Sequence, residues 1–188
     1  MMQQMVISDT SRSQRALYRE LDRIGRIRLS QSFFMRDFLH SEIAAAYSFP
    51  NIPDDIELAI ETGTNLCNKL LEPLQQTFGI IRIRSGYRSE TLNAFGHQRN
   101  LGCAANDKNY ATHIWDHLDR VGRKGASACV VVPSLMNDDL SYEGAKTILD
   151  EWCRTQSELN HMRFFKQPAT FNIGWKSECV GRHVTRNG

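Results

Sequence analysis

The segment from residue 85 to residue 93 holds the densest set of side chains that could bind a ligand. It begins Ser-Gly-Tyr-Arg-Ser, and Asn93 follows four residues after the second serine. Ser85 and Tyr87 offer hydroxyl groups, and the guanidinium of Arg88 can bind a carboxylate through two parallel hydrogen bonds. That chemistry suits recognition of the C-terminal carboxylate of a peptide. An arginine after a turn is also common as a surface salt bridge, so the residues alone leave both roles open.

Histidine and cysteine are the other side chains with ligand chemistry, and they are widely spaced. The six histidines and five cysteines form neither a CxxC pair nor an HExxH motif, so a metal site would have to combine distant segments. The odd number of cysteines favours reduced thiols in a cytoplasmic protein. His113 and His117 would share a face if their segment is helical. Cys129 and His113 could form a nucleophile and its base, although a buried thiol is the commoner role for Cys129.

The elements that must position these residues are short strands among helices. Apolar residues recur at helical spacing from Ile56 to Phe78, where Pro73 is expected to kink or interrupt the helix. Further helices are expected near residues 11–28, 41–47, 89–95 and 141–159, and strands at 80–84, 128–132, 163–167 and 169–175. Helices first, followed by strands mixed with helices, predict an α+β domain whose small, mostly antiparallel sheet has flanking helices.

Size and composition exclude several classes of protein. The 188 residues are 41% apolar and 23% charged, which is typical of one globular domain. No run of residues reaches the roughly 18 apolar positions of a membrane span. The formal net charge of +2 argues against a dedicated nucleic-acid binder, so no nucleic-acid partner is expected. The composition does not indicate an oligomeric state.

The N-terminal 28 residues differ from the rest in charge. They hold six arginines and three acids, a balance of +3, which leaves −1 for residues 29–188. Leu17, Leu21 and Ile24 fall at helical spacing. We therefore predict a basic helical arm over residues 1–28 and a single domain over 29–188. The arm either packs on the domain as an amphipathic helix or binds a partner such as an acidic polymer.

Three segments, in chain order, resemble the zinc D-Ala-D-Ala carboxypeptidases of the Hedgehog/DD-peptidase fold. They are the phenylalanine-rich opening LSQSFFMRDFLHSEIAAAYSFPNIPDD, the helix end LEPLQQTFG, and the strand and turn IRIRSGYRSETLN. The resemblance covers about residues 29–96 and is looser through 110–135 and 163–178. It implies that Arg88 contacts the substrate near the scissile bond, in a substrate site that includes Ser85, Tyr87 and Asn93.

The metal site that the resemblance implies is only partly matched. The family's S-x-H-x-x-G-x-A-x-D motif resembles residues 112–116 followed, after an insertion, by residues 125–129. His113 matches the ligand histidine, and Cys129 stands where the ligand aspartate is expected. Asp116 and Asp119 are nearby acids that could substitute for it. A second motif resembles residues 169–175, with Asn172 in place of the second ligand histidine, and a neutral amide binds zinc far more weakly than imidazole does.

Two functions follow from these matches and departures. The first is a zinc-dependent D-Ala-D-Ala carboxypeptidase that acts on peptidoglycan-type peptides, with His113, Asp116 and Cys129 as metal ligands. Completing that site could recruit His117, His161 or His183, and Glu158 is the nearest acid before the second motif. The second is a catalytically degenerate member that binds a peptide or cell-wall fragment, or that serves as a structural component, without hydrolysis.

Localisation bears on both functions. The start, MMQQMVISDTSRSQR, lacks the apolar core of a secretory signal, which predicts a cytoplasmic protein. A protein that acts on the cell wall must leave the cytoplasm. Release at lysis, as for a phage product, would reconcile the two expectations.

Overall fold

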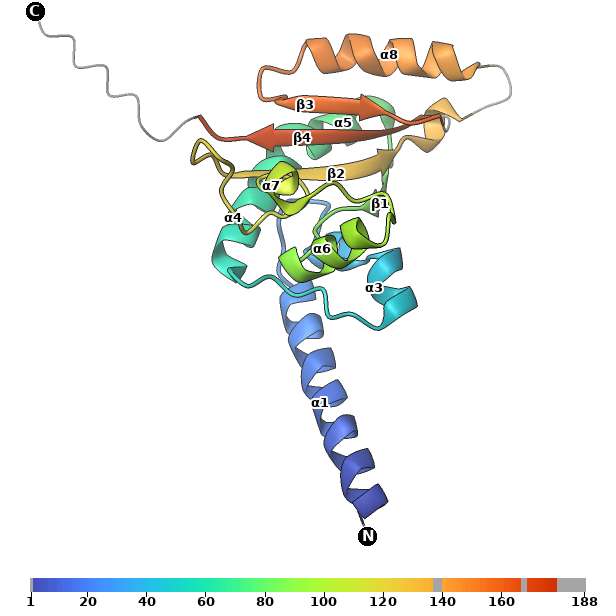
Figure 1. Ribbon diagram of the computed structural model, residues 1–188. Helices are drawn as coiled ribbons and strands as arrows, with labels where there is room; N and C mark the ends of the chain where they lie inside the picture. Colours follow the sequence, from blue (N-terminus) through green and yellow to red (C-terminus); the bar gives the residue numbers. More distant parts are fainter. Residues whose placement is uncertain (1, 137–139, 167–168, 179–188) are drawn as a thin grey trace, which may run out of the picture.

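A four-stranded antiparallel sheet forms the centre of the domain in the computed structural model, which describes residues 2–136, 140–166 and 169–178 (Figure 1). The strands are β1 (Arg82–Ser85), β2 (Gly125–Val131), β3 (His161–Phe164) and β4 (Thr170–Lys176). Their order across the sheet is β1-β2-β4-β3, and all three neighbouring pairs are antiparallel. This arrangement confirms the predicted α+β class and the antiparallel sheet.

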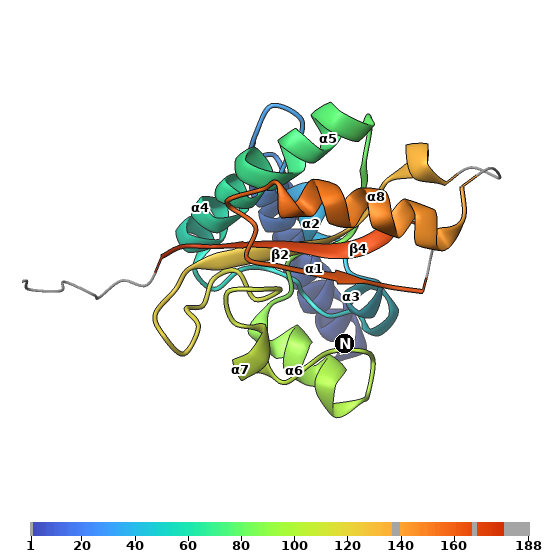
Figure 2. The ribbon, with the colours of Figure 1, turned by 90° about the horizontal axis from the view of Figure 1, so that it is seen from above.

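Helices cover both faces of the sheet. The helices of the described residues are α1 (Met2–Gly25), α2 (Arg36–Leu39), α3 (Glu42–Tyr47), α4 (Ile56–Leu66), the π-helical turn η1 (Cys67–Leu71), α5 (Glu72–Phe78), α6 (Glu90–Gln98), α7 (Asn106–Asn109), the short 3-10 helix η2 (Pro133–Leu135) and α8 (Tyr142–Arg154). Seen from above, α4, α5 and α8 lie on one side of the sheet, and α3, α6 and α7 lie on the other (Figure 2). The sheet therefore separates two layers of helices.

Strand register explains why the two faces differ in chemistry. Residues directly opposite each other on antiparallel strands point to the same face. Ala128 pairs with Ile173, and both side chains belong to the hydrophobic core. Cys129 pairs with Asn172, and the next strand brings Arg163 opposite Asn172. One face is thus apolar and packs on α4 and η1, whereas the other carries thiol, amide and guanidinium groups.

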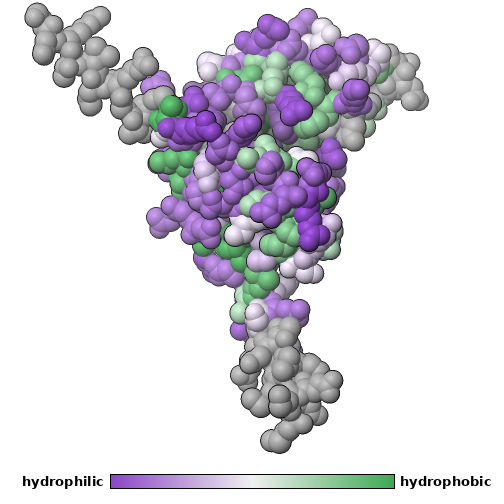
Figure 3. All heavy atoms as spheres, viewed as in Figure 1, coloured by the Kyte–Doolittle hydropathy of each residue, from purple (hydrophilic) through white to green (hydrophobic). Residues whose placement is uncertain are grey.

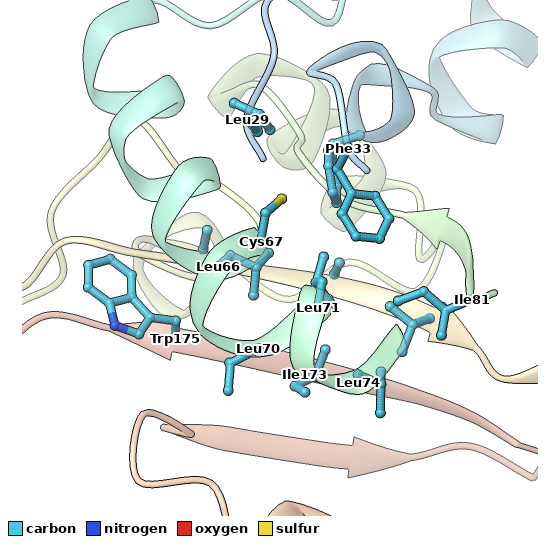
Figure 4. Packing of buried hydrophobic residues seen from close by; sticks show 14 of the residues in the cluster. Leu29, Phe33, Leu66, Cys67, Leu70, Leu71, Leu74, Ile81, Ile173 and Trp175 are labelled. Atoms are coloured by element: carbon cyan, nitrogen blue, oxygen red, sulfur yellow. The ribbon is translucent and has the colours of Figure 1, made fainter. Parts of the chain in front are cut away.

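The long helix expected from Ile56 to Phe78 is interrupted, but not at Pro73. The π-helical turn η1 comes between α4 and α5, and Pro73 lies in the first turn of α5. Proline is tolerated at that position because the amide groups of the first turn have no helical partner. The side chains of Leu70 and Leu74 point from this segment toward β4, where Ile173 meets them (Figure 4).

Other elements also differ from their predicted limits, including β1 and β3, which were expected at 80–84 and 163–167. Strand β2 begins at Gly125 rather than at residue 128, because Gly125 and Ala126 pair with the end of β4. Helix α8 ends at Arg154, five residues early, and the chain then turns so that the Asn160 amide donates to the carbonyl of Gly174. The segment 96–112, expected to be a loop, contains the four-residue helix α7.

Helix α1 joins the domain through its C-terminal end. Ile24 is fully buried, and Leu21 packs against the same core, as the predicted amphipathic spacing requires. The rest of the helix extends away from the sheet and its flanking helices (Figure 1). On the face shown in Figure 3, hydrophilic side chains predominate and hydrophobic areas are interspersed among them. Within the described residues, no helix is both long and apolar enough to cross a membrane.

Candidate functional site

A cavity of about 310 Å³ opens on the polar face of the sheet. Three of the four predicted substrate-binding residues, Ser85, Tyr87 and Arg88, contribute to its wall. His113 and Cys129, which the sequence placed at metal-ligand positions, line the same cavity. Segments that are separated in the chain by up to 44 residues therefore meet at one site.

His113 is held as a neutral imidazole. Its Nδ1 lies 2.9 Å from the carbonyl oxygen of Gly86, so the proton resides on Nδ1 and Nε2 keeps a free lone pair. Burial, together with the nearby charge of Arg88, lowers the pKa of His113 to about 3. The backbone is tied at the same point, because the Arg88 amide donates to the carbonyl of His113 over 2.8 Å.

Asn172 occupies the position where the second ligand histidine was expected. Its Nδ2 lies 3.4 Å from Nε2 of His113, a distance at the limit of a hydrogen bond in which the amide donates to the imidazole. Its Oδ1 is buried without a hydrogen-bond partner, the one such side-chain atom in the part of the chain that the structure describes. A buried acceptor without a donor points to a ligand group that would complete it.

Cys129 is the cross-strand neighbour of Asn172. Burial raises the pKa of its thiol, and the charges of Arg84 and Arg88 offset this only in part. Cys129 is therefore a protonated thiol at neutral pH, which is a poor nucleophile and a poor metal ligand. The cysteines at 67, 103 and 153 are also free thiols, as predicted, and Cys179 lies outside the described residues.

Asp116 lies away from the cavity wall and has a structural environment. Its Oδ2 accepts hydrogen bonds from the backbone amide of Asp54, over 2.8 Å, and from the hydroxyl of Tyr87, over 3.1 Å. Asp119, the other acid that could substitute, accepts from Arg123 and forms an ion pair with Lys176. Neither carboxylate lines the cavity.

The remaining residues considered as ligands or as a base lie elsewhere. His117 stacks on Tyr110 and sits 3.6 Å from a carboxylate oxygen of Glu90, in a segment of turns rather than a helix. His161 faces the hydroxyl of Ser127. Glu158 accepts hydrogen bonds from Lys69 and Trp175. His183 lies outside the described residues. Trp115 and Trp175 are core side chains rather than cavity walls.

These placements leave the cavity short of a metal-binding set. A catalytic zinc needs about three protein ligands and one open position. Within residues 2–136, 140–166 and 169–178, no group of three His, Cys, Asp or Glu side chains is arranged to hold a metal ion. At the cavity itself, only His113 and Cys129 offer donors of a suitable kind, and Asn172 supplies an amide. The described residues therefore supply fewer donors than a catalytic zinc needs.

Arg88 is fixed by a polar network that the sequence did not indicate. Its Nη1 donates to Oδ1 of Asn93 over 3.2 Å and contacts Sγ of Cys103 over 2.8 Å. Asn93 is fully buried, and its own amide donates to the carbonyl of Ala104 and to Asn106. Asn93, predicted to bind substrate, therefore contacts Arg88 instead of lining the cavity, and it holds the guanidinium in place.

Two further arginines make the cavity strongly basic. Arg84 comes from the edge strand β1, and Arg163 comes from the opposite edge strand β3. Among the described lining residues, Glu42 is the one acid against the three arginines. The sequence did not indicate a role for Arg84 or Arg163, because only the strand order shows that both edges of the sheet reach one cavity. The alternation IRIR was the available signal for Arg84.

Comparison of the chain with protein-family models, with curated proteins and with solved structures finds no match.

Proposed function

We propose that this chain is a catalytically degenerate protein of the Hedgehog/DD-peptidase fold that binds the carboxylate end of a peptidoglycan-type peptide without hydrolysing it. The observation that carries the proposal is that Arg88 of the SGYR motif shares one cavity with His113, Cys129 and Asn172. These are the positions at which the family resemblance places the substrate arginine and the three metal ligands. The presence of all four in one cavity supports the proposal.

The charge of the cavity supports a carboxylate ligand. Arg88 is held in place by Asn93, so little side-chain freedom is lost when it binds an anion. The neutral imidazole of His113 adds no competing charge. The unpaired Oδ1 of Asn172 offers an acceptor for a peptide N–H group beside the carboxylate. Together these groups match the amide and terminal carboxylate of a peptide end.

Calorimetric titration with an acylated D-Ala-D-Ala peptide and with its C-terminal amide tests this function. A charge-assisted hydrogen bond contributes roughly 1.5–3 kcal/mol, so the free carboxylate should bind about 10- to 100-fold more tightly than the amide. Arg88→Ala should remove that preference without unfolding the protein, whereas Arg154→Ala, on the exposed side of α8, should not. Equal binding of the two peptides, or no binding of either, would overturn the proposal.

A zinc peptidase is the second candidate, and one observation favours it. The Nδ1 of His113 is fixed by a backbone carbonyl while Nε2 faces the sheet, which is the arrangement typical of metal-bound histidine. Metal analysis of the purified protein decides between the two. Less than about a tenth of an equivalent of zinc, not recovered when metal is added, would remove this candidate, since a catalytic site binds about one.

A further inference from the structure

The exposed arginines of α1 form one continuous stripe. Arg15, Arg19 and Arg23 are each four residues apart, and Arg26 follows three residues later. Its backbone amide donates to the carbonyl of Asp22 over 3.2 Å, so Arg26 continues the helical turn past the end of α1. At 3.6 residues per turn, the four positions fall within an arc of about 80° and span about 16 Å.

The stripe lies opposite the side of α1 that packs on the domain. Leu21 and Ile24 form the packed side, and the same helical geometry places them about half a turn from the arginines. All four arginine side chains are accordingly exposed. Helix α1 also extends clear of the sheet and its flanking helices, so the stripe is open to a large partner (Figure 1).

The ion pairs along α1 leave most of the stripe's charge available. Arg23 pairs with Glu20 over 2.6 Å and Arg26 pairs with Asp22 over 3.0 Å, and both pairs are at the surface, where such pairs are weak. Among the described side chains, Arg15 and Arg19 have no ion-pair partner. A polyanion could therefore contact all four guanidinium groups.

The composition of the stripe indicates which polyanion. Between residues 13 and 26, two apolar side chains border the stripe, Ala16 on one side and Tyr18 on the other, and Tyr18, which is 70% exposed, is the one large one. Protein interfaces depend on buried aromatic or aliphatic anchors, and membrane-bound helices need an apolar side turned toward the lipid. Here the apolar side of α1, at its C-terminal end, already packs on the domain. Charge is what the stripe offers, and a phosphodiester backbone is its complement.

We propose that the arginine stripe of α1 docks on duplex DNA, with the four guanidinium groups contacting phosphates along the major groove. A duplex carries one negative charge per ~1.7 Å of its axis, and its ~12 Å wide major groove admits an α-helix. The near-neutral net charge of the chain conceals this, because the arginines are concentrated on one projecting helix while the rest of the chain is slightly acidic. The contacts are to phosphates, so the binding is independent of base sequence.

The test measures binding of the full chain to a fluorescent 20-base-pair duplex by anisotropy over a range of salt concentrations. The wild type should bind with a dissociation constant of about 10⁻⁴ to 10⁻⁶ M near physiological salt. Arg15→Gln with Arg19→Gln removes two phosphate contacts, so the slope of log K against log salt should become shallower by about 2. The matched control, Arg120→Gln with Arg154→Gln, removes two exposed body arginines and should leave the slope unchanged.

Three outcomes would overturn the proposal. The first is no binding of the duplex at low salt, and the second is equal loss of binding in the stripe variant and the control. The third is tighter binding to vesicles of anionic phosphatidylserine, or to a poly-glutamate peptide, than to the duplex. Circular dichroism of both variants confirms that any loss of binding is not a loss of the helix.

Discussion

The side-chain amide of Asn172 lies against the imidazole of His113, with Nδ2 3.4 Å from Nε2. In the family that the sequence resembles, a second histidine is expected at the position of Asn172, and a metal would lie between the two imidazoles. Here an N–H group faces the lone pair that would bind the metal. The same two backbone positions therefore hold a direct polar contact, and the cavity in front of them is lined by arginines.

Restoring the family residues should create a zinc site. Cys129→Asp together with Asn172→His would give the cavity three ligands with His113, because Cys129 and Asn172 are cross-strand neighbours. After dialysis, the double variant should retain about one equivalent of zinc by elemental analysis. Cys129→Asp alone, which leaves only two ligands, is the control and should retain far less. Equal zinc in the wild type and the double variant would contradict the reading of Asn172 as a lost ligand.

Asp116 should behave as a structural carboxylate. Asp116→Ala leaves the amide of Asp54 and the hydroxyl of Tyr87 without their buried acceptor, which should cost about 2–4 kcal/mol of unfolding free energy. Urea unfolding measures this loss. Asp107→Ala, at an exposed ion pair with Arg120, is the control and should cost less than about 1 kcal/mol. An Asp116→Ala protein of unchanged stability would show that these hydrogen bonds are dispensable.

Local patterns were sufficient for the elements that carry the site. Strand β1 and helix α6 could be predicted because their signals lie within a few residues: alternating apolar side chains, and Ser89, whose hydroxyl accepts from the amide of Leu92. The sequence also singled out His113, Cys129 and Asn172, and all three line one cavity. Each of these elements and residues is indicated by side chains within a few positions of it in the chain.

Contacts between residues far apart in the chain could not be predicted from the sequence. Asp116 accepts hydrogen bonds from Asp54 and Tyr87, which are 62 and 29 residues away. Nothing near Asp116 in the chain therefore distinguishes a buried structural carboxylate from a metal ligand. Arg163 reaches the cavity only because β3 pairs with β4 in one register. The π-helical turn η1 likewise has no local signal, since Pro73 pointed to an interruption six residues too late.

The buried histidines should make stability depend on pH. Burial lowers the folded-state pKa of His113 to about 3, and it also lowers the pKa of His161. Their unfolded forms take up a proton near pH 6.5, so the stabilisation is present above that pH and is lost as the pH falls toward the folded values. Between pH 6.5 and pH 5, the His113 term should cost about 1.5 kcal/mol of unfolding free energy, and His161 should add to the decline in the same direction.

That window separates histidine from carboxylate effects, since carboxylates titrate mainly below it. His113→Gln should remove about 1.5 kcal/mol of the decline between pH 6.5 and pH 5, because the more buried of the two shifted groups is lost. His97→Gln, at an exposed position on α6, is the control and should leave the decline as it is in the wild type. A wild-type protein whose stability is flat across this window would contradict the neutral, buried imidazole.

Gly86 of the SGYR motif should be required because of close packing, not because of its backbone conformation. A glycine after a strand suggests a turn that needs left-handed backbone, but Gly86 is not among the residues with positive φ. What it provides is space, since an added Cβ would lie 2.8 Å from Cβ of Phe38 and 3.1 Å from its Cα. Phe38 is fully buried and packs on Trp115, so it cannot move away cheaply. Gly86→Ala should therefore cost about 1–3 kcal/mol.

The Gly86→Ala substitution should also weaken peptide binding, because the carbonyl of Gly86 fixes the imidazole of His113 and Gly86 precedes Tyr87 and Arg88. Gly144→Ala is the matched control: its Cβ would also meet an atom at 2.8 Å, but that atom is the flexible end of Leu140, and alanine favours the helix. Urea unfolding should show a loss for Gly86→Ala and none for Gly144→Ala, and calorimetry should show weaker peptide binding for Gly86→Ala alone. If the two variants prove equally stable, close packing against Phe38 is not what requires glycine here.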